Sequence, residues 1–263
     1  MLHLDGKVCL QDFSNSFKTK FIVLFLLNDS NQKHDRIYIM AGTLFVVATP
    51  IGNLEDITLR ALRVLKEVDV IVCEDTRKTA NLLRYYNIPK KPLISYYKGV
   101  EKERLPRIMT LLKDGKKVAL CSEAGTPLIS DPGALLVRAA HEEGIKVEPI
   151  PGPSALTAAL QASGIDGGKG FIFLGFLPRK KKDLKEALKY FHLELPVVVY
   201  ISPHRFNKEV SALYEELGER QCFLAREITK LYEELRYSSL SELKERENIK
   251  GEITLIILPE EKS

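Results

Sequence analysis

Apolar runs, each ended by a turn of small or charged residues, alternate along the chain with segments of helical periodicity. Strands are predicted over 44–48, 68–73, 117–121, 145–150, 171–176, 197–201, 222–225 and 252–258. Helices are predicted between them, over 57–65, 78–86, 105–114, 134–143, 155–163, 182–191, 207–217 and 240–244. Strands that alternate with helices imply βαβ units, so the pattern predicts an α/β fold with mostly parallel sheets.

Local signals predict where several of these helices begin and end. Asp56, Asp131 and Ser154 are the expected N-caps of the helices that follow them, because short polar side chains accept hydrogen bonds from free backbone amides. A proline suits the first turn of a helix, so Pro106 places the start of one helix near residue 105. Gly115 is expected to end that helix.

The alternation begins only after Met40 and is interrupted at PGPSA (151–155). We therefore predict two α/β domains, at 40–155 and 156–263, and an upstream extension or poorly ordered arm at 1–39. The apolar run at 21–27 is shorter than the roughly 20 residues that cross a bilayer, and no small-x-small cleavage site follows it. Translation is expected to begin at Met40.

Composition narrows the functional classes only slightly. The chain has 263 residues, 45% of them hydrophobic and 28% charged, and a net charge of +4, which is typical of a folded globular protein. Cys9, Cys73, Cys121 and Cys222 form no CxxC pair, so neither a zinc ribbon nor a redox dithiol is expected. We expect no metal, no membrane segment and a reducing, cytoplasmic location.

Small and charged residues gather at predicted strand ends, where open α/β sheets bind ligands. The first turn, ATPIGNLED (48–56), lacks the GxGxxG pattern of dinucleotide-binding folds. In CEDTRKT (73–79), Glu74, Asp75 and Arg77 could hold a substrate, move a proton or pair with one another. CSEAGTPLISDPG (121–133) is small and stiff, and Gly125 permits a ligand to approach the backbone closely.

Cations gather in the second half of the chain. A run of four follows an aromatic residue in GFLPRKKK (175–182), which suits a phosphate backbone and is unfavourable for the dipole of the helix that begins there. ISPHRF (201–206) and AREITKLYEE (225–234) add charges at further strand ends. The residues concerned are Arg179, Lys180, Lys181, Lys182, His204, Arg205, Arg226, Glu227 and Lys230. A solvated or internally paired surface is the alternative for each of them.

Taken together, these stretches resemble one family closely. TPIGNLED, CEDTR, SEAGTPLISDPG, PGPSA, GFLPRK, SPHR and AREITKLYEE occur in the order found in the bacterial 16S rRNA cytidine 2′-O-methyltransferases, which belong to the tetrapyrrole methylase superfamily. The resemblance covers about residue 42 to the end of the chain. It implies two α/β domains with S-adenosylmethionine in the cleft between them, a homodimer, and methylation of a cytidine ribose in the 16S rRNA of the small ribosomal subunit.

The resemblance also implies roles for individual residues. Expected cofactor contacts are Pro50, Gly52, Ser122, Glu123, Gly125, Thr126, Pro127, Ser154 and Ala155, with Leu174 and Ala225 from the second domain. Expected acid–base or charge-stabilising residues are Glu74, Asp75, Arg77, Glu227 and Lys230. Expected RNA contacts are Arg179, Lys180, Lys181, Lys182, His204, Arg205 and Arg226.

Two positions depart from the family pattern, which usually has Asp in place of Glu123 and Glu in place of Ile201. Two other functions stay open at this point. One is a methylase of the same superfamily that acts on a corrin or porphyrin, for which four adjacent cations would have little use. The other is an RNA-binding assembly factor without catalysis, against which the intact loop at 121–133 argues.

Overall fold

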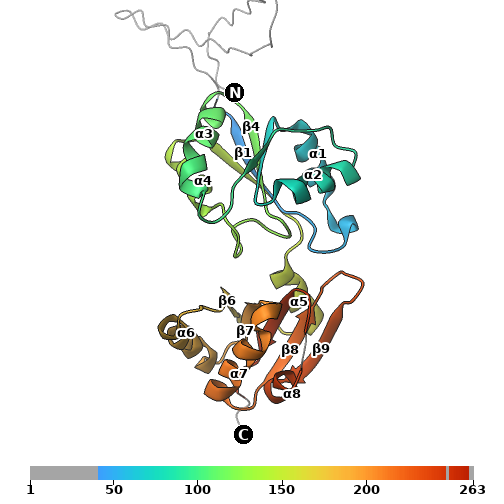
Figure 1. The fold of residues 1–263 in the computed structure, drawn as a ribbon, viewed down its shortest axis with the longest axis vertical. Helices are drawn as coiled ribbons and strands as arrows, with labels where there is room; N and C mark the ends of the chain where they lie inside the picture. Colours follow the sequence, from blue (N-terminus) through green and yellow to red (C-terminus); the bar gives the residue numbers. More distant parts are fainter. Residues whose placement is uncertain (1–40, 247–248, 261–263) are drawn as a thin grey trace, which may run out of the picture.

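The computed structural model describes residues 41–246 and 249–260. The predictions for residues 1–39, Cys9 and Met40 lie outside the described residues. Figure 1 shows two α/β domains stacked along the long axis of the molecule, one built on β1 to β5 and the other on β6 to β10. The predicted α/β class with two domains is confirmed.

The first domain is a parallel sheet covered by helices on both faces, with the strand order β3-β2-β4-β1-β5. Helices α1 and α2 pack on one face, and α3 and α4 pack on the other (Figure 1). The strands are β1 (Thr43–Val47), β2 (Val70–Cys73), β3 (Leu93–Ser95), β4 (Lys117–Cys121) and β5 (Lys146–Ile150). The helices are α1 (Leu59–Glu67), α2 (Thr76–Tyr85), α3 (Glu101–Lys113) and α4 (Ala134–Glu142). Burial on both faces explains why β2 and β4 are nearly continuous apolar runs.

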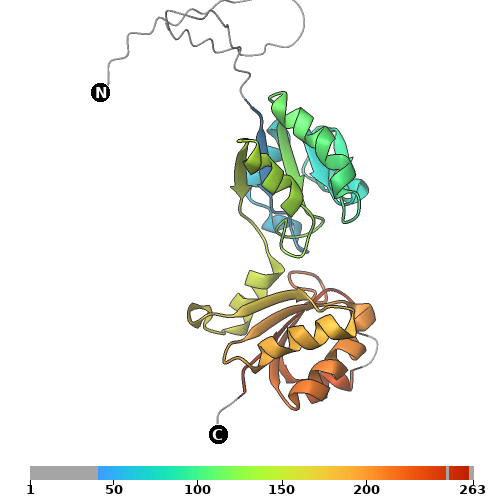
Figure 2. The same ribbon diagram turned by 90° about the vertical axis from the view of Figure 1, so that its left-hand side faces the viewer.

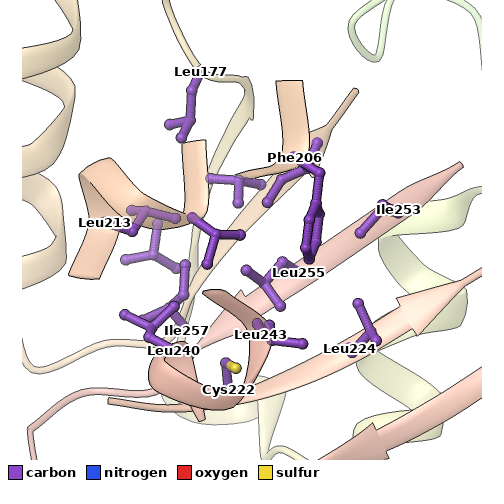
Figure 3. Packing of buried hydrophobic residues seen from close by; sticks show 14 of the residues in the cluster. Leu177, Phe206, Leu213, Cys222, Leu224, Leu240, Leu243, Ile253, Leu255 and Ile257 are labelled. Carbon is purple, nitrogen blue, oxygen red and sulfur yellow. The ribbon is translucent and has the colours of Figure 1, made fainter. Parts of the chain in front are cut away.

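The second domain has the strand order β6-β7-β10-β8-β9. Its strands are β6 (Ile172–Phe176), β7 (Val197–Ile201), β8 (Gln221–Arg226), β9 (Glu234–Ser239) and β10 (Ile253–Ile257). Its helices are α5 (Ala155–Ser163), α6 (Lys181–Leu188), α7 (Phe206–Leu217) and α8 (Leu240–Lys244). Helices α6, α7 and α8 enclose the main core, in which Phe206 and Leu213 meet Leu255 of the central strand (Figure 3). Helix α5 covers the opposite face, on the side of the first domain (Figures 1 and 2).

The prediction of mostly parallel sheets is wrong for the second domain. Among its described strands, only β6 and β7 pair in parallel, whereas β10 runs antiparallel to both β7 and β8, and β8 runs antiparallel to β9. The chain turns back directly from β8 into β9 without a crossover helix. Strand β9 was not predicted because its ELRYSS sequence is largely polar, and its pairing with β8 includes the ion pair of Glu234 with Arg226.

Several predicted helix starts are also wrong. Thr58, not Asp56, caps α1, and its hydroxyl accepts from the backbone N–H of Ala61 at 3.1 Å. Helix α3 begins four residues earlier than predicted and contains Pro106. Proline has no N–H, so the carbonyl four residues before Pro106 has no helical hydrogen-bond donor. Because Pro106 lies on the exposed side of the helix, water can reach that carbonyl.

The helix that follows the 121–133 loop is capped differently from the prediction as well. Gly133 occupies the N-cap position of α4, and its N–H donates to the Glu101 carboxylate at 3.1 Å, so Asp131 is not the cap. Ser154 does stand at the N-cap position of α5, but it makes no capping side-chain bond within the described structure.

Candidate active site

The ends of β1, β2 and β4 form one wall of the site, because these parallel strands are neighbours in the sheet. Thr49 after β1 and Gly125 after β4 exchange two backbone hydrogen bonds of 2.9 Å, which ties the first turn to the 121–133 loop. The Thr126 hydroxyl donates to the Pro153 carbonyl at 3.0 Å, so the segment that leads into α5 joins the same wall.

Two close contacts connect this wall to the second domain. The backbone N–H of Asn53 donates to the Thr229 hydroxyl at 3.0 Å, and a Cβ on Gly52 would stand 2.5 Å from Cγ of Lys230. At the other contact, Gly175 of β6 has φ +63°, and a Cβ there would stand 2.6 Å from Oγ of Ser130. Because a side chain fits at neither glycine, the two contacts set how closely the domains approach.

A cavity of about 330 Å³, here called the cleft cavity, lies between the domains. The first domain supplies Glu74 and residues 123–126 and 129–131, and the second supplies residues at the ends of β6 and β7 and at the start of β10. The rings of Phe176 and Tyr200 line it and meet edge to face, with centroids 5.5 Å apart. Its volume lies within the range of about 300–1,000 Å³ that is usual for small-molecule sites.

Glu74, Glu123 and Asp131 line the cleft cavity from the first domain. The pKa of Asp131 is raised to about 6, mainly by burial and also by the charges of Glu74 and Glu123, whereas a hydrogen bond from Ser122 lowers it. Burial also raises the pKa of Glu74, as does the charge of Glu123, whereas Lys78 lowers it. Carboxylates and aromatic faces around one cavity favour a cationic ligand.

A second cavity of about 480 Å³ lies beside α2 and is here called the α2 cavity. It shares the four residues Ile51, Glu123, Ala124 and Glu252 with the cleft cavity. Its remaining wall is formed by the first turn, one face of α2 and Lys230. The two cavities therefore adjoin at these four residues.

Lysines in the α2 cavity pair with carboxylates. The Lys78 ammonium donates to the Glu123 carboxylate. The Lys230 ammonium donates to Glu227 at 2.8 Å and to Glu252 at 2.9 Å. Glu123 thus contacts a cation on the α2 side while it faces the cleft cavity on the other.

The structure divides the predicted cofactor residues between the two cavities. Glu123, Gly125, Thr126, Ser154 and Ala155 line the cleft cavity, and Pro50, Gly52, Ser122 and Glu123 line the α2 cavity. Pro127 is instead buried within its loop. Leu174 packs against the core under α6 to α8, and Ala225 is buried in the cluster that includes α5. Phe176, Tyr200 and Thr254 are among the residues of these strands or their neighbours that line the cleft cavity.

The predicted acid–base residues are dispersed. Glu74 lines the cleft cavity, and Lys230 lines the α2 cavity. Asp75 instead caps α2, accepting from the backbone N–H of Arg77 at 2.8 Å, and it also pairs with the Arg77 guanidinium, whose hydrogen bond lowers the pKa of Asp75. Glu227 accepts from the backbone N–H of Glu252 at 2.8 Å as well as from Lys230, so it braces the loop between β8 and β9.

Some predicted RNA contacts have internal partners. Arg205 donates to the Leu177 carbonyl at 3.3 Å and pairs with the buried Glu209 at 2.9 Å. Arg226 donates to the Glu234 carboxylate at 2.9 Å and to the Lys250 carbonyl at 3.1 Å. The other predicted RNA contacts are exposed: the run at the start of α6, Arg179, Lys180, Lys181 and Lys182, and the side chain of His204.

Several residues that line the two cavities were not among the predicted site residues. They are Lys78, Asn81, Tyr85, Asp131, Phe176, Tyr200 and Thr254. Asp131 belongs to a motif that was recognised, and Lys78 and Tyr85 lie on the helix that follows CEDTR, so the motif positions could have indicated these three.

Membrane-spanning helices and clusters of metal-binding side chains are both absent from residues 41–246 and 249–260. In these ranges no helix is long and apolar enough to cross a bilayer. No cluster of three His, Cys, Asp or Glu side chains in the same ranges could hold a metal ion. Cys73, Cys121 and Cys222 are buried free thiols.

Comparison with known proteins gives a consistent result. Residues 43–244 match the sequence model of the family described as Tetrapyrrole (Corrin/Porphyrin) Methylases. The chain is 49% identical to ribosomal RNA small subunit methyltransferase I of Thermotoga maritima over 220 residues, covering 82% of this chain and 98% of that protein. Identity to the protein of the same name from Halalkalibacterium halodurans is 45%, covering 82% of this chain and 75% of that protein.

Solved structures share the fold at much lower identity. Diphthine synthase superimposes with a TM-score of 0.66 at 16% identity, covering 83% of this chain and 90% of that one. Uroporphyrin-III C-methyltransferase of Thermus thermophilus, in complex with S-adenosylhomocysteine, gives 0.60 at 18% identity, covering 82% and 97%.

Proposed function

The chain belongs to the tetrapyrrole (corrin/porphyrin) methylase family, and we propose that it uses S-adenosylmethionine to methylate the ribose 2′-hydroxyl of a cytidine in 16S rRNA. One observation carries this proposal. The chain is 49% identical to a relative named ribosomal RNA small subunit methyltransferase I, and the match covers 98% of that relative's length. A homodimer and a cytoplasmic location, both expected from the sequence, belong to the same proposal.

The cleft cavity has the chemistry that S-adenosylmethionine requires. Glu74, Glu123 and Asp131 offer negative charge to a ligand that carries a sulfonium and an ammonium group. Phe176 and Tyr200 offer aromatic surface for its adenine ring. When bound, the cofactor supplies a methyl group on sulfur, and transfer of that group to oxygen breaks the sulfur–methyl bond and leaves S-adenosylhomocysteine.

Residues around the two adjoining cavities supply the groups that a ribose hydroxyl needs. A hydroxyl is a poor nucleophile until its proton leaves, so a carboxylate within reach accelerates the reaction. Glu123 and Glu74 are the proposed proton acceptors, and the Lys78 ammonium beside Glu123 offsets the negative charge that develops on the oxygen. Lys230 supports the same region from the second domain.

The exposed run Arg179 to Lys182 is proposed to bind phosphates of the RNA. It follows Phe176 of the cleft cavity, so bound phosphates would lie near the reacting groups. Arg205 is proposed to position this run rather than to bind RNA. Its guanidinium donates to the carbonyl of Leu177, just before the run, and pairs with the Glu209 carboxylate.

The test uses small ribosomal subunits from cells that lack this gene, with methyl-labelled S-adenosylmethionine. The wild-type protein is expected to label 16S rRNA. Lys78→Met is expected to lower the rate by about 10²–10³-fold, because it removes a cation at the developing charge. Lys113→Met is the matched control, since Lys113 is also an exposed lysine paired with a glutamate, Glu143, at 2.9 Å.

Two outcomes would contradict the proposed function. One is a wild-type protein that binds S-adenosylmethionine and leaves the rRNA unlabelled. The other is a protein that labels a corrin or porphyrin in preference to the subunits.

A further inference from the structure

The α2 cavity is distinct from the proposed cofactor site, and we propose that it holds the unstacked target ribonucleotide of the RNA, with the base against Tyr85. This inference rests on the proposed RNA methyl transfer. It adds a binding site for one nucleotide and a residue that recognises it.

The position of the α2 cavity suits the nucleotide that reacts. Ile51, Glu123, Ala124 and Glu252 line both cavities, so the two cavities adjoin and ligands in them would meet at these shared residues. An in-line transfer requires the reacting atoms to approach to about 3–3.5 Å. A ribose at the inner end of the α2 cavity would lie beside Glu123, which faces both cavities.

The outer part of the cavity presents an aromatic ring. One face of α2 lines the cavity, with residues three or four positions apart: Lys78, then Asn81 and Leu82, then Tyr85. The Tyr85 side chain is 61% exposed although it belongs to this wall. Single-stranded RNA is recognised mainly by stacking of unpaired bases on such rings.

The Tyr85 ring is supported from behind. Tyr86 meets it edge to face, with centroids 5.0 Å apart and planes at 90°. The Tyr86 hydroxyl donates to the Leu54 carbonyl of the first turn, which fixes Tyr86 in place. An exposed ring supported in this way can receive a base with little loss of side-chain freedom.

The charges of the α2 cavity fit one nucleotide better than a polycarboxylate macrocycle. Among its described lining residues, the two ammonium groups of Lys78 and Lys230 are balanced by the two carboxylates of Glu123 and Glu252. A macrocycle with several acidic side chains would meet almost no net positive charge there. An RNA chain carries its other phosphates outside this cavity, so its binding does not depend on the charge of the cavity alone.

The test compares three variants in the methyl-transfer assay on small subunits from cells that lack the gene. Tyr85→Ala is expected to raise KM for the subunits at least about fivefold, the factor that corresponds to the lower end of base–aromatic stacking. Tyr85→Phe, which keeps the ring, is expected to retain the wild-type KM. Tyr190→Ala is the matched control, because Tyr190 is an exposed tyrosine in the turn after α6. Calorimetric affinity for S-adenosylmethionine is expected to be equal in all four proteins.

The outcomes separate this inference from the function on which it rests. If the wild type labels rRNA and Tyr85→Ala has an unchanged KM, the inference is overturned and the proposed function stands. If Tyr85→Phe is as impaired as Tyr85→Ala, or if Tyr85→Ala loses cofactor affinity, stacking at Tyr85 is excluded. If the wild type transfers no label to rRNA, both proposals fall.

Discussion

Asp131 illustrates at the residue scale how burial in the cleft changes the chemistry of a side chain. The pKa of its carboxyl is raised from an ordinary value of 3.8 to about 6, mainly by burial and also by the charges of the nearby Glu74 and Glu123. The folded protein therefore holds a proton on Asp131 more tightly than the unfolded chain does. Ionisation of Asp131 costs folding stability, and that cost develops as the pH rises from about 4 to about 6.

The same ionisation should favour the cofactor, and this gives a pH-dependent prediction. Affinity for S-adenosylmethionine is expected to increase as the pH rises through about 6, because Asp131 then loses its proton and the carboxylate attracts the sulfonium or ammonium group. Below that pH, the loss of one proton corresponds to an increase in affinity of up to about tenfold per pH unit. Asp131→Asn is expected to flatten this dependence. Calorimetric titrations between pH 5 and pH 7.5 measure both proteins. An Asn variant that keeps the full wild-type pH profile would show that another group is responsible.

Only part of the site could be predicted residue by residue. Glu123 and Gly125 lie in a loop whose small, stiff composition already indicated a ligand. Asp131 lies in the same loop, but its spacing before a helix equally suited a cap, and only the folded path shows that its carboxyl faces the cavity. Phe176 and Tyr200 could not be identified, because aromatic residues at strand ends are more often core residues.

At the scale of elements, β6 and the 121–133 loop determine each other's position. The pairing of β6 with β7 shifts between Phe173 and Gly175, and this irregularity coincides with the positive φ of Gly175. Ser130, which lies against Gly175, itself has φ 71°. Both elements contribute to the cleft cavity, so a change in their contact should alter cofactor binding.

Gly175→Ala is therefore expected to destabilise the protein by about 1–3 kcal/mol and to weaken cofactor binding, because the added Cβ meets Ser130 and adopts an unfavourable φ. Ser130→Gly should stabilise the Gly175→Ala protein more than it stabilises the wild type, because it also removes the colliding hydroxyl. Gly167→Ala is the matched control, since a Cβ at Gly167 would meet no described atom within 4 Å. Thermal unfolding and calorimetry provide the measurements. Equal effects of Ser130→Gly in both backgrounds would contradict the proposed contact.

Most strands and helices could be predicted from periodicity, but sheet direction in the second domain could not. A buried strand such as β10 is a continuous apolar run, and this pattern is the same for parallel and antiparallel neighbours. The edge strand β3 is three residues long and therefore leaves little periodic signal. Strand β9 is stabilised by pairs across the hairpin, such as Phe223 with Tyr237, and local sequence does not display such pairs.

At the scale of the whole molecule, function depends on how the two domains face each other. The segment before α5 carries the chain from the first sheet to the second (Figure 2). The resulting cleft brings the strand ends of the first domain against β6, β7 and β10 of the second. Periodicity within either domain carries no information about this arrangement, so before the structure only the resemblance to a family implied a site between domains.

The proposed reaction places the methyl group on a ribose oxygen of 16S rRNA. The chemical position of the transferred label therefore tests it directly. Label transferred to small subunits would be released from the purified rRNA by alkaline hydrolysis, which requires a free 2′-hydroxyl at each cleaved linkage. The label is expected in an alkali-resistant dinucleotide whose 5′ residue is cytidine. Label recovered in a mononucleotide, on the base, would contradict it.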